Sequence, residues 1–163
     1  MMRVGGTRGF AEAQPSARRA VSTDLALLLE LYLCLNPSMP KLSNERARAL
    51  WASTLSRQGT FIFVSDAASR IVATCMLITA PNLMRGGRQH AFIENVVTHP
   101  DFRRHGHGRA VMKAALDMAW VEDCHHVLLQ SGRKDPGVHR FYETCGLEPG
   151  LRTAYVARRP SAL

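Results

Sequence analysis

The sequence predicts a single α/β domain in which helices flank a mixed β-sheet. Segments with helical and strand patterns alternate along the chain, and 46% of the residues are hydrophobic against 21% charged, as in ordinary globular domains. The 163 residues are enough for one well-buried core and too few for two comfortable ones. Residues 1–16 are rich in glycine and in small or polar residues, so we expect a flexible N-terminal tail over 1–16 and a folded domain over 17–163.

The N-terminal half predicts a short strand followed by two helices. The strand is expected over 17–21, and Ser22 or Thr23 can cap the first helix, with an Asn-Pro pair at 36–37 ending it. A second helix, capped by Ser43, is expected over 43–57. The first helix carries an apolar stripe at helical spacing, made of Leu25, Leu28, Leu29, Tyr32 and Leu33.

The C-terminal half alternates strand and helix patterns. Its last helix begins with Asp135 as N-cap and Pro136 in the first turn, and Gly146 fits the position just past its end. A longer helix is expected over 106–122. Apolar and β-branched runs predict strands over 61–65, 71–79, 90–98, 127–129 and 152–157.

Charge and cysteine usage narrow the class of protein. The formal net charge of +8 suits a phosphate-rich ligand, an acidic surface or nucleic acid, but no basic run is interleaved with aromatic residues, which argues against nucleic acid. The four cysteines form no C-x-x-C pair, so we expect neither a zinc site nor a disulfide framework. We expect reduced thiols in a cytoplasmic protein instead. The longest apolar segment, 25–35, is broken by Glu30 and too short to cross a bilayer, so no membrane partner is expected.

The most informative stretch is the basic, glycine-containing turn over 103–110, which follows a strand pattern and opens a helix pattern. The first amides of a helix have no partner inside the helix, and its dipole places partial positive charge there. The turn therefore predicts an anion site, with a pyrophosphate as its natural ligand. It is not a Rossmann fingerprint, because Val111 stands where the third glycine belongs, and Gly-Lys-Ser/Thr of a P-loop occurs nowhere.

Three motifs in order resemble those of the GCN5-related N-acetyltransferases. Arg103, Gly106 and Gly108 match the Arg/Gln-x-x-Gly-x-Gly/Ala motif, and 98–100 loosely match the V-x-P-like strand end before it. Residues 141–147 match the F-Y-E-x-x-G-F/L element. The resemblance implies a mostly antiparallel sheet, acetyl-CoA as co-substrate, and direct attack of a primary amine on the bound thioester. Homodimers are common in this family, so a homodimer is a further expectation.

The resemblance also implies roles for individual residues. Val96, Val97 and Thr98 would offer backbone groups to the pantetheine arm and the acetyl carbonyl. Tyr142 would be the general acid that protonates the leaving thiolate, although an aromatic pair with Phe141 facing the core would explain it too. The backbone amides of Arg104, His105, Gly106, His107, Gly108 and Arg109 would hold the pyrophosphate, and Arg103 and Arg109 would either add charge or only be solvated. No third ligand accompanies the two histidines of the turn, so we expect no metal there.

The general base is less defined by the sequence. Residues 93–97 resemble the I-E-D-[IV]-[AV] strand of glucosamine-6-phosphate N-acetyltransferases, and 124–127 resemble their C-Y-K-V/I element. Glu94 is therefore the candidate base, since burying an unpaired carboxylate is costly. An ion pair between Glu94 and a nearby arginine is the alternative, and a water or His90, His99 or His139 could relay the proton instead.

Two departures from the family pattern leave further alternatives open. Gln130 stands where some members have a catalytic Glu, and Asp135 stands where many have an Asn that contacts the cofactor, although its N-cap role explains it equally. A non-catalytic acetyl-CoA-binding regulatory module is therefore the alternative to an enzyme. The acceptor stays open between a small-molecule amine and a peptide amine.

Overall fold

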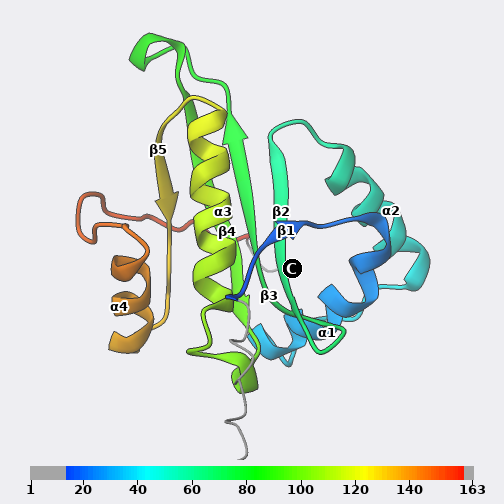
Figure 1. Cartoon of the computed structure of the whole chain (residues 1–163). Helices are drawn as coiled ribbons and strands as arrows, with labels where there is room; N and C mark the ends of the chain where they lie inside the picture. The colour runs from blue at the N-terminus through cyan, green and yellow to red at the C-terminus, as the bar shows by residue number, and fades with distance from the viewer. Residues whose placement is uncertain (1–13, 160–163) are drawn as a thin grey trace, which may run out of the picture.

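The computed structural model describes residues 14–159, and its centre is a five-stranded sheet with the order β1-β2-β3-β4-β5 (Figure 1). The pairs from β1 to β4 are antiparallel, whereas β5 runs parallel to β4 because α3 connects them. The fold is thus the mixed, mostly antiparallel α/β sheet that the sequence predicts. The strands are β1 (Arg18–Arg19), β2 (Thr60–Ala67), β3 (Arg70–Ala80), β4 (Gln89–Thr98) and β5 (Cys124–Leu129); the helices are α1 (Leu25–Leu35), α2 (Asn44–Ser56), α3 (His107–Val121) and α4 (Pro136–Thr144).

The ends of the helices follow from local side chains. The Ser43 hydroxyl accepts a hydrogen bond from the Arg46 amide at the start of α2, and the Asp135 carboxylate accepts one from the Gly137 amide at the start of α4. Gly146 lies just past α4 with a φ of 91°, which a residue with a side chain rarely adopts. The predicted caps of α2 and α4 are confirmed.

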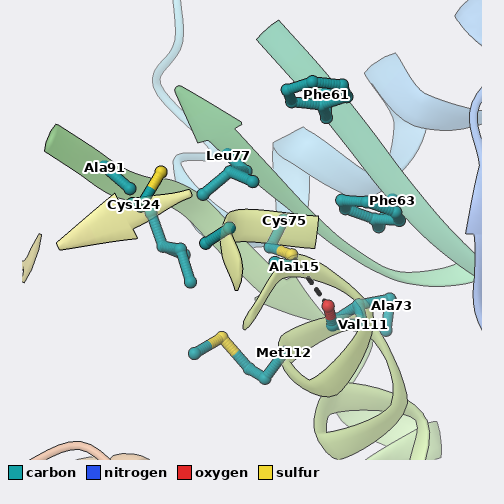
Figure 2. Packing of buried hydrophobic residues seen from close by; sticks show 12 residues of the cluster. Phe61, Phe63, Ala73, Cys75, Leu77, Ala91, Val111, Met112, Ala115 and Cys124 are labelled. Atoms are coloured by element: carbon teal, nitrogen blue, oxygen red, sulfur yellow. Dashed lines mark hydrogen bonds between the residues drawn. The ribbon is translucent and has the colours of Figure 1, made fainter. Parts of the chain in front are cut away.

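Two apolar clusters cover the two faces of the sheet. Alternate strand residues such as Phe63, Cys75 and Ile93 pack against α3, while Ile62 and Val64 pack on the other face against α1 and α2. Figure 2 shows the first cluster, in which the buried Cys75 thiol donates to the Val111 carbonyl at 3.2 Å. The sheet is therefore buried on both sides, and helix α3 is held firmly against its centre.

Three predictions about local structure are wrong. Residues 152–157 form no strand: the segment is exposed and pairs with no strand among the described residues. Neither Ser22 nor Thr23 caps α1, because both lie in a 3-10 turn (Ser22–Asp24) held by the Asp24 carboxylate, which accepts from the Val21 amide and from Arg18. In α1 it is Leu28 and Leu31 that are buried, whereas Leu33 of the predicted stripe is 43% exposed.

The predicted tail over 1–16 falls largely outside the described residues. Its last three residues are described, and two of them make defined contacts, since the Ser16 carbonyl accepts a hydrogen bond from Ser65 and Pro15 approaches Gly106. Across 14–159 no helix combines the length and apolar character needed to cross a membrane.

Candidate active site

The candidate active site lies where β4 and β5 separate. The parallel pairing of these strands runs up to Ile93 and Leu129 and stops there. At the same level β4 bulges: Met76 pairs with Glu94 and Thr74 with Val97, so one residue of β3 faces two of β4. The extra residue is Asn95, with a φ of 53° in the left-handed region. The bulge bends β4 away from its neighbour and opens the sheet.

A cavity of about 200 Å³ fills this opening. Glu94, Asn95 and Val96 line it from β4, and Arg133 lines it from the loop that follows β5. Tyr142 closes it from α4. Both predicted catalytic residues, Glu94 and Tyr142, therefore border one cavity although they are far apart in the sequence.

The Tyr142 ring is half-buried beside Phe141, with their ring centroids 5.3 Å apart. Burial raises the pKa of Tyr142, and the charge of Arg133 opposes this rise. Among the described residues, nothing hydrogen-bonds to the Tyr142 hydroxyl. The phenol thus carries its proton at neutral pH and keeps it free for a ligand in the cavity.

Glu94 lies on the face of β4 opposite α3 and is exposed to the cavity. Within the described part of the chain, no arginine, lysine or histidine lies within ion-pairing distance of its carboxylate. The alternative in which Glu94 is neutralised by a neighbouring arginine is therefore not what the structure shows. Its carboxylate is left available to a ligand.

The basic turn precedes α3 and leaves the start of this helix without a side-chain cap. Its N-cap, Gly106, has a φ of 93°, and Arg104 also has a positive φ of 65°. Such a turn directs successive amides toward one concave side, which suits an anion. Arg103 is tied back to the strand, since its Nε donates to the Thr98 carbonyl at 3.4 Å.

Helix α3 lies close to β4 at Gly108. A Cβ atom at this position would lie 2.8 Å from the Thr98 Oγ1 atom and 3.2 Å from the Phe141 ring. The second glycine of the motif is thus required by the packing of strand and helices, which sets the distance between the turn and β4.

The remaining predicted site residues have different surroundings. The bulge resets the alternation of β4, so Val96 packs on the α3 side and borders the cavity, whereas Val97 is buried on the other side against α1 and α2. Asp135 makes the N-cap bond described above and does not line the cavity. Arg104, His105 and Arg109 are exposed around the turn, and His107 is buried at 7% exposure.

Sequence reasoning missed Asn95 and Arg133. Asn95 could have been suspected because asparagine tolerates the left-handed region better than most residues, yet nothing in a strand pattern marks a bulge. Arg133 lies in a polar loop directly after the strand that is parallel to β4. Residues that follow neighbouring parallel strands meet at one edge of a sheet, and this rule could have indicated that Arg133 lies near the end of β4.

Histidines gather at the opposite ends of β4 and β5. The rings of His90 and His126, which are paired in register, have centroids 5.2 Å apart, and His125 lies 5.2 Å from His126. Burial lowers the pKa of His126, and the positive charges of Arg152 and Arg85 add to this effect. Within residues 14–159, no group of three or more His, Cys, Asp or Glu side chains is arranged to hold a metal ion.

Known proteins resemble this chain in sequence and in fold. The Acetyltransferase (GNAT) family model matches residues 28–147. A glucosamine 6-phosphate N-acetyltransferase of Trypanosoma brucei brucei is 32% identical over 126 residues, which are 76% of this chain and 82% of that protein. A solved structure from Agrobacterium tumefaciens, assigned as an acetyltransferase, is 44% identical with a TM-score of 0.83, covering 88% of this chain and 99% of its own. The glucosamine-6-phosphate N-acetyltransferase of Arabidopsis thaliana shares the fold, with a TM-score of 0.78 at 20% identity over 90% of this chain and 99% of its own.

Proposed function

This chain belongs to the acetyltransferase (GNAT) family, and on that premise we propose that it moves the acetyl group of acetyl-CoA to a primary amine by direct attack in the cavity between β4 and β5. The observation that carries the proposal is the meeting of Glu94 and Tyr142 at this cavity. The family and the named relatives make the protein an acetyltransferase; the direct attack and the roles of single residues are our proposal.

The residues present fit acetyl-CoA. The turn at 104–109 offers unbonded amides at an uncapped helix start together with exposed arginines, which suits the pyrophosphate. The opened edge of β4 from Val96 to Thr98 leaves backbone groups for the pantetheine arm, and Asp135 stays a weaker candidate for a cofactor contact. Acetyl-CoA supplies the activated acetyl group when bound.

Glu94 and Tyr142 divide the proton transfers. The Glu94 carboxylate takes a proton from the attacking amine, directly or through a water, because a protonated amine has no free electron pair. The Tyr142 hydroxyl gives its proton to the departing sulfur. An amide of the bulged part of β4 would donate to the carbonyl oxygen, on which negative charge develops as the C–N bond forms. That charge is lost as the C=O bond re-forms and the C–S bond breaks, and the nitrogen then loses its second proton, which restores the Tyr142 phenol.

For the acceptor we propose a phosphorylated amino sugar. Side chains alternate along a strand, so Glu94 and His90 lie on one face of β4, about 13 Å apart along the strand. His126 lies beside His90 on β5, with Arg85 and Arg152 near enough to lower its pKa. An amine in the cavity would therefore meet the Glu94 carboxylate, and a phosphate directed toward His126 would meet the positive charges of Arg85 and Arg152. The Trypanosoma relative is named for such a substrate.

The first experiment measures CoA release with glucosamine 6-phosphate and with glucosamine as acceptors. We expect the phosphorylated sugar to have the lower KM, and Arg152→Gln to raise that KM about tenfold while changing the KM for glucosamine little. Equal KM values for both sugars, or an Arg152→Gln effect that is the same for both, would contradict the proposed acceptor.

The second experiment tests the general acid. We expect Tyr142→Phe to lower kcat about 100-fold and leave the Kd for acetyl-CoA unchanged, because the phenol acts on the leaving group. An unchanged kcat would remove this role from Tyr142.

Two further predictions concern the oligomeric state and the location of the protein. We propose a homodimer, since residues 151–159 are exposed and include Tyr155 at 90% and Val156 at 78% exposure. Sedimentation measures the oligomeric state directly. We also propose a cytoplasmic protein, because its four cysteines are free in the structure.

A further inference from the structure

Among the described residues, His107 is the only buried histidine, and the proposed chemistry does not use its side chain. It is the first residue of α3, at the centre of the basic turn, and is 7% exposed. Its ring does not point to solvent as a cationic ligand would. Instead its Nδ1 atom lies 2.9 Å from the Ser65 Oγ atom of β2.

The neighbouring bond decides which atom donates. The Ser65 hydroxyl donates its single proton to the Ser16 carbonyl at 2.6 Å. It can therefore only accept from His107, and the ring must carry its proton on Nδ1. Burial and the nearby His105 lower the pKa of His107, so the ring is neutral at neutral pH and this tautomer leaves Nε2 unprotonated.

This chain of bonds joins three segments that are distant in the sequence. It links the first turn of α3 to β2 and to the residues just before β1. Pro15 adds a second contact, because a Cβ at Gly106 would lie 3.4 Å from the Pro15 ring. On its other side the turn meets Thr98 and Phe141 at Gly108. The turn is thus braced from both sides while its amides stay free.

We propose that His107 is a positioning residue for the cofactor, which fixes the unbonded amides at the start of α3 through its bond to Ser65 and, through Ser65, to Ser16. The inference rests on the proposed function, since it takes these amides as the pyrophosphate site. An uncapped helix start frays easily, and a donor that is tied to a central strand restrains it without occupying the amides. His107 thereby lowers the ordering cost of binding.

The first test reads the tautomer by nitrogen NMR of the wild-type protein above pH 7. We expect the proton of His107 on Nδ1, both without and with acetyl-CoA. A proton on Nε2 would overturn the proposal, because the bond to Ser65 would then be absent.

The second test measures the Kd of acetyl-CoA by calorimetry for two variants matched in size. His107→Leu removes the donor, and we expect the Kd to rise about tenfold. His107→Asn places an amide NH₂ near the position of Nδ1, and we expect its Kd to stay within about threefold of the wild type. In steady-state assays the loss should appear in the KM for acetyl-CoA and leave kcat nearly unchanged, because the tie acts on binding.

A double-mutant cycle with Ser65→Ala separates the effect of the His107–Ser65 hydrogen bond from general destabilisation. If one bond links the two residues, His107→Leu with Ser65→Ala should bind no more weakly than the weaker single variant. Additive losses, or an Asn variant that folds but binds as weakly as the Leu variant, would overturn the proposal. If the Leu variant fails to fold, the Asn and Ser65→Ala variants and the tautomer still decide it.

The outcomes also separate this inference from the proposed function. A wild-type protein without measurable acetyl-CoA binding would refute the cofactor site itself. Wild-type binding with the same Kd in every variant would refute only the positioning role of His107.

Discussion

Replacing Gly108 by alanine tests how the cofactor turn is held against β4. The added methyl group would lie 2.8 Å from the Thr98 Oγ1 atom and 3.2 Å from the Phe141 ring. Carbon and oxygen do not approach to 2.8 Å without a bond, so something must shift. The Thr98 side chain is β-branched and sits in a strand, which restricts its rotation, and the Phe141 ring is fixed by α4.

The size of the effect follows from two opposing contributions. Overpacking of this kind costs about 1–3 kcal/mol, while replacing glycine in a helix gains up to about 1 kcal/mol. We expect a net loss of about 1–2 kcal/mol in the free energy of unfolding, which lowers Tm by about 2–8 °C in a chain of this size. Because the shift moves the turn from β4, the Kd for acetyl-CoA should also rise.

Thermal melting followed by circular dichroism, with calorimetry for acetyl-CoA, checks both effects. Thr98→Ala supplies the control, because it removes the atom that the new methyl group would meet. The double variant should recover part of the stability lost by Gly108→Ala. A Gly108→Ala variant that melts at or above the wild-type temperature and binds acetyl-CoA normally would refute the reasoning.

Three further predictions concern charge and protonation. Glu94→Gln should lower kcat about 100-fold and remove the acidic limb of the pH–rate profile, and an untouched profile would exclude Glu94 as the base. The folded pKa of His107 lies below its unfolded value of 6.5, so the unfolded chain binds more protons between these values; stability should fall as pH drops below 6.5, and less steeply in His107→Asn, as urea titrations can measure. Asp24 is 5% exposed and accepts from Arg18 at 2.7 Å, so Asp24→Asn should cost about 1–3 kcal/mol in urea titrations at pH 7, and an unchanged midpoint would show that the pair adds nothing.

Local patterns in the sequence were sufficient to predict most helices and strands. The caps at Ser43 and Asp135 and the positive φ at Gly146 were readable because each depends on a few neighbouring residues. The strand, basic turn and helix around Gly106 were readable for the same reason. The expected strand over 152–157 failed because a β-pattern forms a strand only beside a partner, and none of the described strands pairs with it.

By itself the sequence determined the order of elements as far as α4, the basic turn, and the candidates Glu94 and Tyr142, since these depend on contiguous residues and on a motif. Only the tertiary structure decided that the two candidates border one cavity, because that depends on where β4 leaves β5 at the Asn95 bulge. It also decided the surroundings of His107. In the sequence this residue belongs to the basic turn, but in the structure it is buried and hydrogen-bonded to Ser65. A contact between residues 42 positions apart has no local signature, since it forms only when β2 and α3 pack together.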